Sequence, residues 1–245
     1  MQKNVIDIQG IPFYSTTMKE FVHHEVKKRI DEEKQTFIVT ANPEIVEYAR
    51  DNEDYRQMIL QADYIVPDGV GIIIASKIIK KPLKERVTGF DMMHEFFKMD
   101  TKRPLRVYML GAEEEVIATA AKKVKEMYPQ IDLVGYHNGF FDIEDEKLAT
   151  RIATLELDII LLGMGFPRQE KWIMKYRKKF RKGVFIGIGG SFDVLAGKLK
   201  RAPNIWIKLN VEWLYRLLQQ PSRWKRMKVL PAFLIKVIKQ TIKKS

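Results

Sequence analysis

Short apolar segments separated by helical patterns are the feature that most constrains the fold of this 245-residue chain. Such segments are typical of buried strands, and they occupy residues 36–40, 64–66, 105–110, 131–136, 158–162 and 184–188. Amphipathic helices are predicted near residues 17–31, 43–61, 69–80, 89–100, 113–128, 144–155 and 168–180. This alternation predicts an α/β fold: a mostly parallel, Rossmann-like sheet with helices on both faces. Apolar and polar residues alternate over 5–14 around Gly10, which predicts a small N-terminal β-hairpin.

The positive charge of the chain is confined to one end. Residues 1–195 contain 30 basic and 30 acidic residues, whereas residues 196–245 contain 13 basic residues and one acid, Glu212. The whole formal charge of +12 therefore lies in the last 50 residues. We predict an α/β catalytic core over 1–195 and a basic helical appendage over 196–245 that meets an anionic partner.

The appendage contains two amphipathic helical patterns. Residues 204–220 carry Trp206 and Trp213 on one apolar stripe, and a second stripe that includes Phe233 follows Pro231 and is faced by lysines. Basic amphipathic helices with tryptophan are typical of a segment lying in a membrane surface. An anionic membrane surface is thus the favoured partner. The alternatives are a docked helix whose stripe belongs to the core, and a nucleic acid, which we do not expect.

Several classes of protein and site are disfavoured. The chain has no cysteine, so it has no disulfide, thiolate metal site or cysteine nucleophile. Its N-terminal residues lack the apolar run of a signal peptide, and no stretch reaches the ~18 apolar residues of a spanning helix. These features predict a cytoplasmic protein. The four histidines lack metal-ligand spacing, and an acidic helix start explains residues 142–145, so we expect neither metal nor cofactor.

Polar residues that follow the first two predicted strands are candidate site residues, because ligands of parallel sheets bind beyond the carboxyl ends of the strands. Thr40 ends the predicted strand 36–40 and Asn42 follows it, and either side chain could bind a sugar. Asn42 could equally cap the helix that begins at Pro43. Asp68 follows the second strand, where a carboxylate is either a helix cap or a general base. Position alone leaves both roles open.

Glycine-rich turns follow the last two predicted strands. Gly163 and Gly165 precede a helix start whose free N–H groups suit a phosphate or a sugar hydroxyl. Gly189 and Gly190 permit close approach of a ligand, and the nearby Asp193 could accept ribose hydroxyls. Neither turn is a complete G-x-G-x-x-G fingerprint, which argues against a dinucleotide enzyme. A lone cation, Arg86, is either a surface charge or a phosphate clamp.

Taken together, these segments resemble the WecG/TagA/CpsF glycosyltransferase family, most closely its TagA branch. The likeness runs in order along nearly the whole chain. It is carried by Thr40-Ala-Asn-Pro-Glu44, Pro67-Asp-Gly69, Glu85-Arg-Val-Thr-Gly89 with Asp91, Gly163-Met-Gly-Phe-Pro-Arg-Gln-Glu170, Gly187-Ile-Gly-Gly-Ser-Phe-Asp193, Arg201-Ala-Pro203, Glu212-Trp213 with Arg216, and Pro221-Ser-Arg223 with Arg226.

The resemblance implies an inverting transferase that moves N-acetylmannosamine from UDP-ManNAc to the 4-hydroxyl of GlcNAc-diphospho-undecaprenol. The product is the β-linked disaccharide of the wall teichoic acid linkage unit. UDP-ManNAcA or another UDP-sugar, serving a different surface polysaccharide, is the alternative donor. A dinucleotide or S-adenosylmethionine enzyme, and a non-catalytic basic module, are the rival classes. The implied location is the inner face of the cell membrane, and a homo-oligomer is left open.

The resemblance also implies roles for individual residues. Asp68 is implied to be the base, Thr40 and Asn42 to hold the sugar, and Arg86 to lie near the active site, where we hypothesise that it helps to bind diphosphate. Gln169 and Asp193 are implied to contribute to the nucleotide-sugar pocket, together with the glycines named above. The appendage is implied to bring three arginines over the pocket: Arg216, Arg223 and Arg226.

Overall fold

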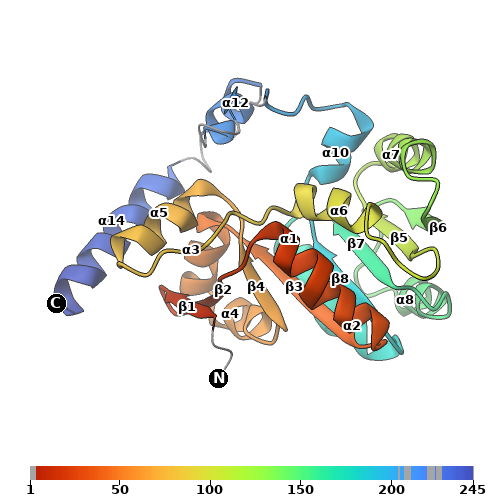
Figure 1. Cartoon of the computed structure of the whole chain (residues 1–245), viewed down its shortest axis with the longest axis horizontal. Coiled ribbons are helices and arrows are strands. Elements are labelled where there is room, and N and C mark those ends of the chain that lie inside the picture. Colours follow the sequence, from red (N-terminus) through yellow and green to blue (C-terminus); the bar gives the residue numbers. More distant parts are fainter. Residues whose placement is uncertain (1–3, 204, 207–210, 220–223, 225–227, 245) are drawn as a thin grey trace.

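A six-stranded, all-parallel sheet forms the centre of the protein in a computed structural model, which describes residues 4–203, 205–206, 211–219, 224 and 228–244 (Figure 1). The strand order is β4-β3-β8-β7-β5-β6. The strands are β3 (Gln35–Ala41), β4 (Tyr64–Pro67), β5 (Arg106–Gly111), β6 (Asp132–His137), β7 (Ile159–Gly163) and β8 (Gly183–Gly187). All six predicted strands are therefore confirmed, as is the α/β class.

Helices cover both faces of this sheet. One face carries α3 (Pro43–Asp51), α4 (Glu53–Ile59), α5 (Val70–Ile78), α8 (Glu146–Ala153), α9 (Arg168–Tyr176) and α14 (Val229–Lys244). The other carries α1 (Met18–Glu20), η1 (Phe21–Val26), α2 (Lys27–Asp31), α6 (Gly89–Phe97), α7 (Glu114–Met127) and α10 (Ser191–Ala196). A short turn, η2 (Arg177–Lys179), follows α9, and α12 (Glu212–Gln219) lies in the appendage.

Successive side chains of each strand contribute to the hydrophobic cores on the two faces of the sheet. In β7, Ile160 and Leu162 pack with the helices of the first face, whereas Ile159 and Leu161 pack with those of the second. Successive side chains of a strand point to opposite faces, so a strand covered on both sides needs a continuous apolar run. This is why the buried strands were recognisable in the sequence as unbroken apolar segments.

Two predicted helices are interrupted, and the predicted hairpin is confirmed. The hairpin pairs β1 (Val5–Ile8) with β2 (Ile11–Tyr14) in antiparallel register, with Gly10 at φ +79° in its turn. The helix predicted near 43–61 is divided at Asn52, whose extended backbone separates α3 from α4. The helix predicted near 17–31 contains a π-helical stretch, η1, between α1 and α2.

The chain changes face beside β8, and this change opens a crevice. Strands β3 and β7 are followed by α3 and α9, which lie on the first face. Strand β8 pairs with both of them but is followed by α10, which lies on the second face. Where the connections after neighbouring strands leave toward opposite faces, a crevice is left between them just outside the carboxyl ends of the strands, and open α/β sheets bind ligands there.

The C-terminal helix α14 is docked on the core. It lies beside α3 and α5 (Figure 1), with Phe233 and Val237 fully buried and an ion pair between Lys236 and Glu47. The docked-helix alternative thus describes one face of α14, while the division of the chain at residue 195 stays a prediction. No helix among the described residues has the length and apolar character needed to cross a membrane.

Candidate functional site

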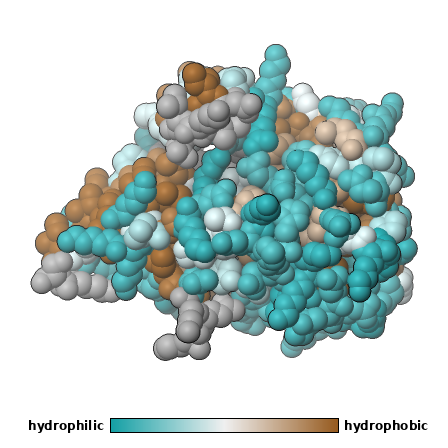
Figure 2. Space-filling model, in the orientation of Figure 1, coloured by the Kyte–Doolittle hydropathy of each residue, from teal (hydrophilic) through white to brown (hydrophobic). Residues whose placement is uncertain are grey.

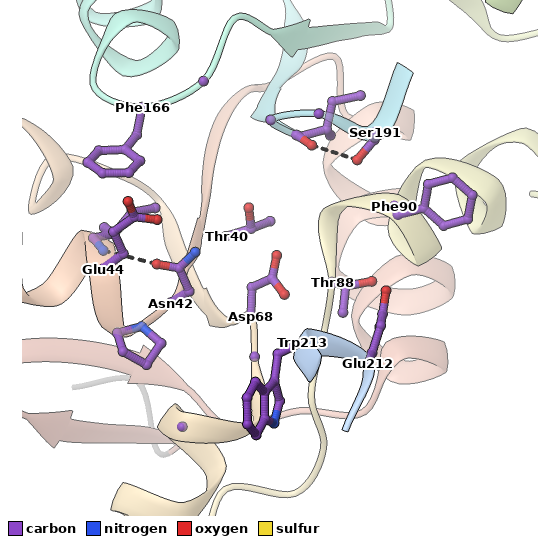
Figure 3. Close-up of a pocket in the computed structure, with 18 of the residues that line it drawn as sticks. Thr40, Asn42, Glu44, Asp68, Thr88, Phe90, Phe166, Ser191, Glu212 and Trp213 are labelled. Atoms are coloured by element: carbon purple, nitrogen blue, oxygen red, sulfur yellow. Dashed lines mark hydrogen bonds between the residues drawn. The ribbon is translucent and has the colours of Figure 1, made fainter. Parts of the chain in front are cut away.

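A cavity of about 360 Å³ opens at the carboxyl ends of the strands, where the connections after β3, β7 and β8 leave toward different faces of the sheet. Its walls come from the residues that follow β3, β4, β7 and β8, from the start of α6, and from α12 (Figure 3). Of the predicted site residues, eight line it: Thr40, Asn42, Asp68, Arg86, Gly165, Gln169, Gly189 and Gly190.

The β3 wall presents Thr40 and Asn42. The buried Thr40 hydroxyl donates to the carbonyl of Gly187 in the adjacent strand at 3.0 Å. Asn42 is the N-cap of α3, and its Oδ1 accepts the backbone N–H of Ile45 at 3.0 Å. The capping role considered for Asn42 is confirmed, and the nitrogen end of its amide is turned toward the cavity (Figure 3). One side chain can therefore both cap the helix and donate to a ligand.

Asp68 lies at the end of β4. Its backbone N–H donates to the carbonyl of Ala41 at 2.9 Å, which ties this turn to β3. The N-cap of α5 is Gly69, at φ +103°, so the capping position falls one residue beyond Asp68. Figure 3 shows the carboxylate pointing into the middle of the cavity, between Asn42 and Thr88. This placement suits a group that acts on a bound molecule.

Arg86 forms part of the cavity wall and is not a free surface charge. Its Nη1 donates to Glu212 Oε2 at 3.2 Å, and only 17% and 8% of the two side chains are exposed. Glu212 belongs to α12, so this ion pair joins the appendage to the core at the edge of the cavity. A guanidinium has five N–H donors, and a single bond to Glu212 leaves others for an anionic ligand.

The glycine-rich turns differ in what they offer. Gly165 and Gly189 have φ values of +74° and +53°, and a Cβ at either would meet nothing within 4 Å. Their backbones thus face open space in the cavity, in a conformation that favours glycine. A Cβ at Gly163 would lie 2.4 Å from Phe192, so this glycine serves packing, and it does not line the cavity. Asp193, in the first turn of α10, does not line it either.

Gln169 and Glu170 form a buried polar pair beneath the cavity. Gln169 Nε2 donates to Glu170 Oε1 at 2.7 Å, and Gln169 Oε1 accepts the backbone N–H of Gly189 at 3.3 Å. Glu170 is 1% exposed, and burial raises the pKa of its carboxyl to about 7. Gln169 was predicted, whereas no role was assigned to Glu170.

Other cavity residues were not predicted as site residues: Glu44, Thr88, Phe90, Phe166, Ser191, Lys200, Glu212 and Trp213. Trp213 was expected on the apolar stripe of the appendage, and the structure places it in the cavity wall. Thr88 is the N-cap of α6, and its hydroxyl donates to Asp91 Oδ2 at 2.7 Å. Two signals in the sequence could have pointed to members of this group. Ser191 directly follows the glycines after β8, and Glu212 is the single acid of the basic appendage.

The described structure does not place Arg216, Arg223 and Arg226 over the cavity. Arg216 belongs to α12, but its side chain lies outside the description, and Arg223 and Arg226 lie outside the described residues. Their predicted position above the cavity stays a prediction.

The chemistry of the cavity suits a polar, anionic ligand. Hydroxyls and amides of Thr40, Asn42 and Ser191 can bind sugar hydroxyls, and the Arg86 guanidinium and exposed glycine backbones can bind phosphate. The Asp68 carboxylate adds a group able to accept a proton. These groups are of the kinds that can bind a phosphorylated sugar and act as a general base.

Comparison with known proteins agrees with this chemistry. Residues 6–245 match the model of the glycosyl transferase WecG/TagA/CpsF family. An N-acetylglucosaminyldiphosphoundecaprenol N-acetyl-beta-D-mannosaminyltransferase of Staphylococcus aureus (strain MW2) is 42% identical over 96% of this chain and 92% of its own length. The protein of the same name from Bacillus spizizenii is 39% identical over 95% of this chain and 90% of its own length. The chain belongs to the WecG/TagA/CpsF glycosyltransferase family.

Proposed function

We propose that this protein transfers N-acetylmannosamine from UDP-ManNAc to the 4-hydroxyl of GlcNAc-diphospho-undecaprenol, with inversion at the anomeric carbon. The observation that carries the proposal is the position of the Asp68 carboxylate, in the middle of a cavity that Arg86 also lines. The names of the relatives support the acceptor and the transferred sugar. The product would be the β-linked disaccharide of the wall teichoic acid linkage unit.

Asp68 is the proposed general base of a direct displacement. Its carboxylate takes the proton from the acceptor 4-hydroxyl while the oxygen forms a bond to the anomeric carbon. The bond between that carbon and the diphosphate breaks at the same time, and UDP leaves with the bonding electron pair. Attack opposite the leaving group converts one anomer into the other. The proton ends on Asp68, so the step balances without an added reagent.

Arg86 and the exposed glycine backbones are proposed to stabilise the leaving diphosphate. Negative charge grows on the diphosphate as its bond to the sugar breaks, and preorganised donors at that point lower the barrier. Arg86 lines the same cavity as Asp68 and is held in place by Glu212. Thr40, Asn42 and Gln169 would then orient the donor sugar, since all three line the cavity.

The acceptor is lipid-linked, and α14 supports the proposal that the protein lies on the inner face of the cell membrane. While one face of α14 packs on the core, Ile235, Ile238 and Ile242 remain 52%, 43% and 70% exposed on another. The space-filling view shows hydrophobic surface gathered along this helix (Figure 2). An apolar face on a basic helix is typical of interfacial binding.

A donor screen tests the proposed function. Vesicles that carry GlcNAc-diphospho-undecaprenol are incubated with the protein and with UDP-ManNAc, UDP-ManNAcA or UDP-GlcNAc, and the anomeric configuration and linkage of the product are determined by NMR. We expect transfer from UDP-ManNAc with a β1→4 linkage. Preferential use of UDP-ManNAcA would reassign the donor. Absence of transfer from every donor, with tight binding of NAD in place of UDP, would reject the glycosyltransferase assignment.

A further inference from the structure

The buried carboxyl of Glu170 has no role in the chemistry proposed above. It lies in the first turn of α9, 1% exposed, directly after the cavity residue Gln169. Burying a carboxyl is unfavourable unless its oxygens are hydrogen-bonded, so a buried glutamate needs an explanation. One oxygen, Oε1, accepts from Gln169. The other, Oε2, lies within normal hydrogen-bond distance of no donor among the described residues, although the buried hydroxyl of Tyr55, which has no partner at that distance either, is close enough to lower the pKa of the Glu170 carboxyl.

The hydrogen bond to Glu170 fixes which way the Gln169 amide points. A side-chain amide has a donor end and an acceptor end of almost equal shape, so its orientation depends on its partners. Glu170 Oε1 accepts at 2.7 Å and selects the nitrogen end, while the Gly189 N–H donates at 3.3 Å and selects the oxygen end. Both partners therefore favour the same orientation. One N–H proton of Gln169 is used in this pair, and the second is left for a ligand oxygen.

The amide also lies tightly against β8. A Cβ at Gly187 would come within 2.2 Å of Gln169 Nε2, so the amide occupies the space that a side chain would need. The carbonyl of the same Gly187 accepts the Thr40 hydroxyl at 3.0 Å. Glu170, Gln169 and Thr40 thus converge on the turn at the end of β8, beneath the cavity. Movement of the Gln169 amide would disturb the Gly189 backbone that faces the ligand.

We propose that Glu170 is a positioning residue that acts through Gln169, holding its amide so that it anchors Gly189 and presents one N–H to an acceptor oxygen of the bound nucleotide sugar. This inference rests on the proposed function for the identity of the ligand. It assigns Glu170 no contact with substrate. The raised pKa of the Glu170 carboxyl is compatible with this role, because either oxygen of a protonated carboxyl, too, can accept from the amide.

A double-mutant cycle tests the proposal with steady-state kinetics, the donor being varied at saturating acceptor. Glu170→Leu removes the acceptor, and we expect kcat/KM for the donor to fall about 10- to 100-fold, as activity does when the hydrogen-bond partner of a metal-ligating side chain is removed. Glu170→Gln keeps an acceptor oxygen, and we expect it to stay within about threefold of the wild type. Because Glu170 acts through Gln169, the double variant Q169L/E170L should match Q169L alone.

Three outcomes would overturn the proposal: wild-type kinetics in E170L, a loss in E170Q as large as in E170L, or a double variant whose loss is the product of the two single losses. Thermal unfolding checks that each variant folds, and Glu170→Met, which keeps the side-chain length, replaces a leucine variant that does not. UDP affinity is measured by calorimetry on the same proteins. If the wild type transfers no sugar, the proposed function fails. The UDP affinities of the same four proteins then still show, as a double-mutant cycle, whether Glu170 acts through Gln169.

Discussion

Asp68 is the residue on which the proposed chemistry depends most. It sits where β4 ends, with Gly69 rather than Asp68 in the capping position of α5, and its carboxylate points into the cavity. We expect Asp68→Asn to lower kcat by about 10²- to 10⁴-fold, because the amide cannot accept the acceptor proton. UDP affinity, measured by calorimetry, should change less than about threefold. Turnover near the wild-type rate would remove Asp68 as the base.

A second prediction concerns how Glu170 makes the free energy of unfolding depend on pH. Burial raises the pKa of its carboxyl from 4.5 to about 7, so between these pH values the folded state binds a proton that the unfolded state releases. The free energy of unfolding therefore falls as pH rises through this window, by about 3 kcal/mol for this group. The Glu170→Gln variant has no titrating group at this position. Its stability relative to the wild type should increase by up to about 3 kcal/mol between pH 4.5 and 8.

Urea unfolding across that pH range measures the difference. The matched control is Glu126→Gln on α7, an exposed glutamate, which should stay within about 0.5 kcal/mol of the wild type at every pH. An E170Q curve parallel to that of the wild type would show that the Glu170 carboxyl does not carry a proton preferentially in the folded state.

At the scale of the element, α14 has two apolar faces that serve different purposes. Phe233 and Val237 are buried against the core, whereas Ile238 and Ile242 are exposed on another side of the helix. We expect I238K/I242K to weaken binding to anionic vesicles by at least tenfold, because two apolar side chains leave the interface even though two positive charges are gained. Folding should be unaffected, since both positions are exposed. Vesicle sedimentation at fixed salt measures the affinity.

Ala232→Lys is the matched control for this element. Ala232 is exposed on α14, and replacing it adds a charge without removing a large apolar side chain, so vesicle binding should be unchanged or slightly stronger. Equal binding of I238K/I242K and the wild type would show that α14 does not insert its outer face. The ion pair between Lys236 and Glu47 is retained in both variants and keeps α14 on the core.

At the scale of the whole molecule, the sequence predicted the strands and the edge that carries the site. Apolar runs such as those of β7 and β8 are visible because both faces of each strand are buried, and parallel strands bring residues as distant as Thr40 and Gly189 to one edge. Contacts that depend on the packing of α12 and α14 were not predictable. The Arg86–Glu212 pair joins residues 126 positions apart, and no local pattern encodes it.

The amino ends of the strands lie at the end of the sheet opposite the site, and contacts there hold the strands together. Asp158, 2% exposed, precedes β7 and accepts hydrogen bonds from the Arg103 guanidinium, the Arg106 backbone N–H and the Lys182 ammonium at 2.6–3.0 Å. Burial alone would raise the pKa of this carboxyl, but these donors outweigh it and hold the pKa below its ordinary value of 3.8. The amino ends of β5, β7 and β8 are thereby joined by one carboxylate.

We expect Asp158→Ala to lower the free energy of unfolding by about 3–5 kcal/mol at pH 7, because it removes the buried partner of the Lys182 ammonium and leaves it only the half-exposed Glu33. Glu113→Ala, which breaks the exposed pair with Lys198, should lower the free energy of unfolding by less than about 1 kcal/mol.

Since the pKa of Asp158 is lower in the folded state, the contribution of its charge to the free energy of unfolding is complete above the unfolded-state pKa and is lost as pH falls through the folded-state pKa. The gap between D158A and the wild type in urea unfolding should therefore narrow below about pH 4. A gap that stayed constant down to pH 2 would mean that packing, rather than charge, makes Asp158 stabilising.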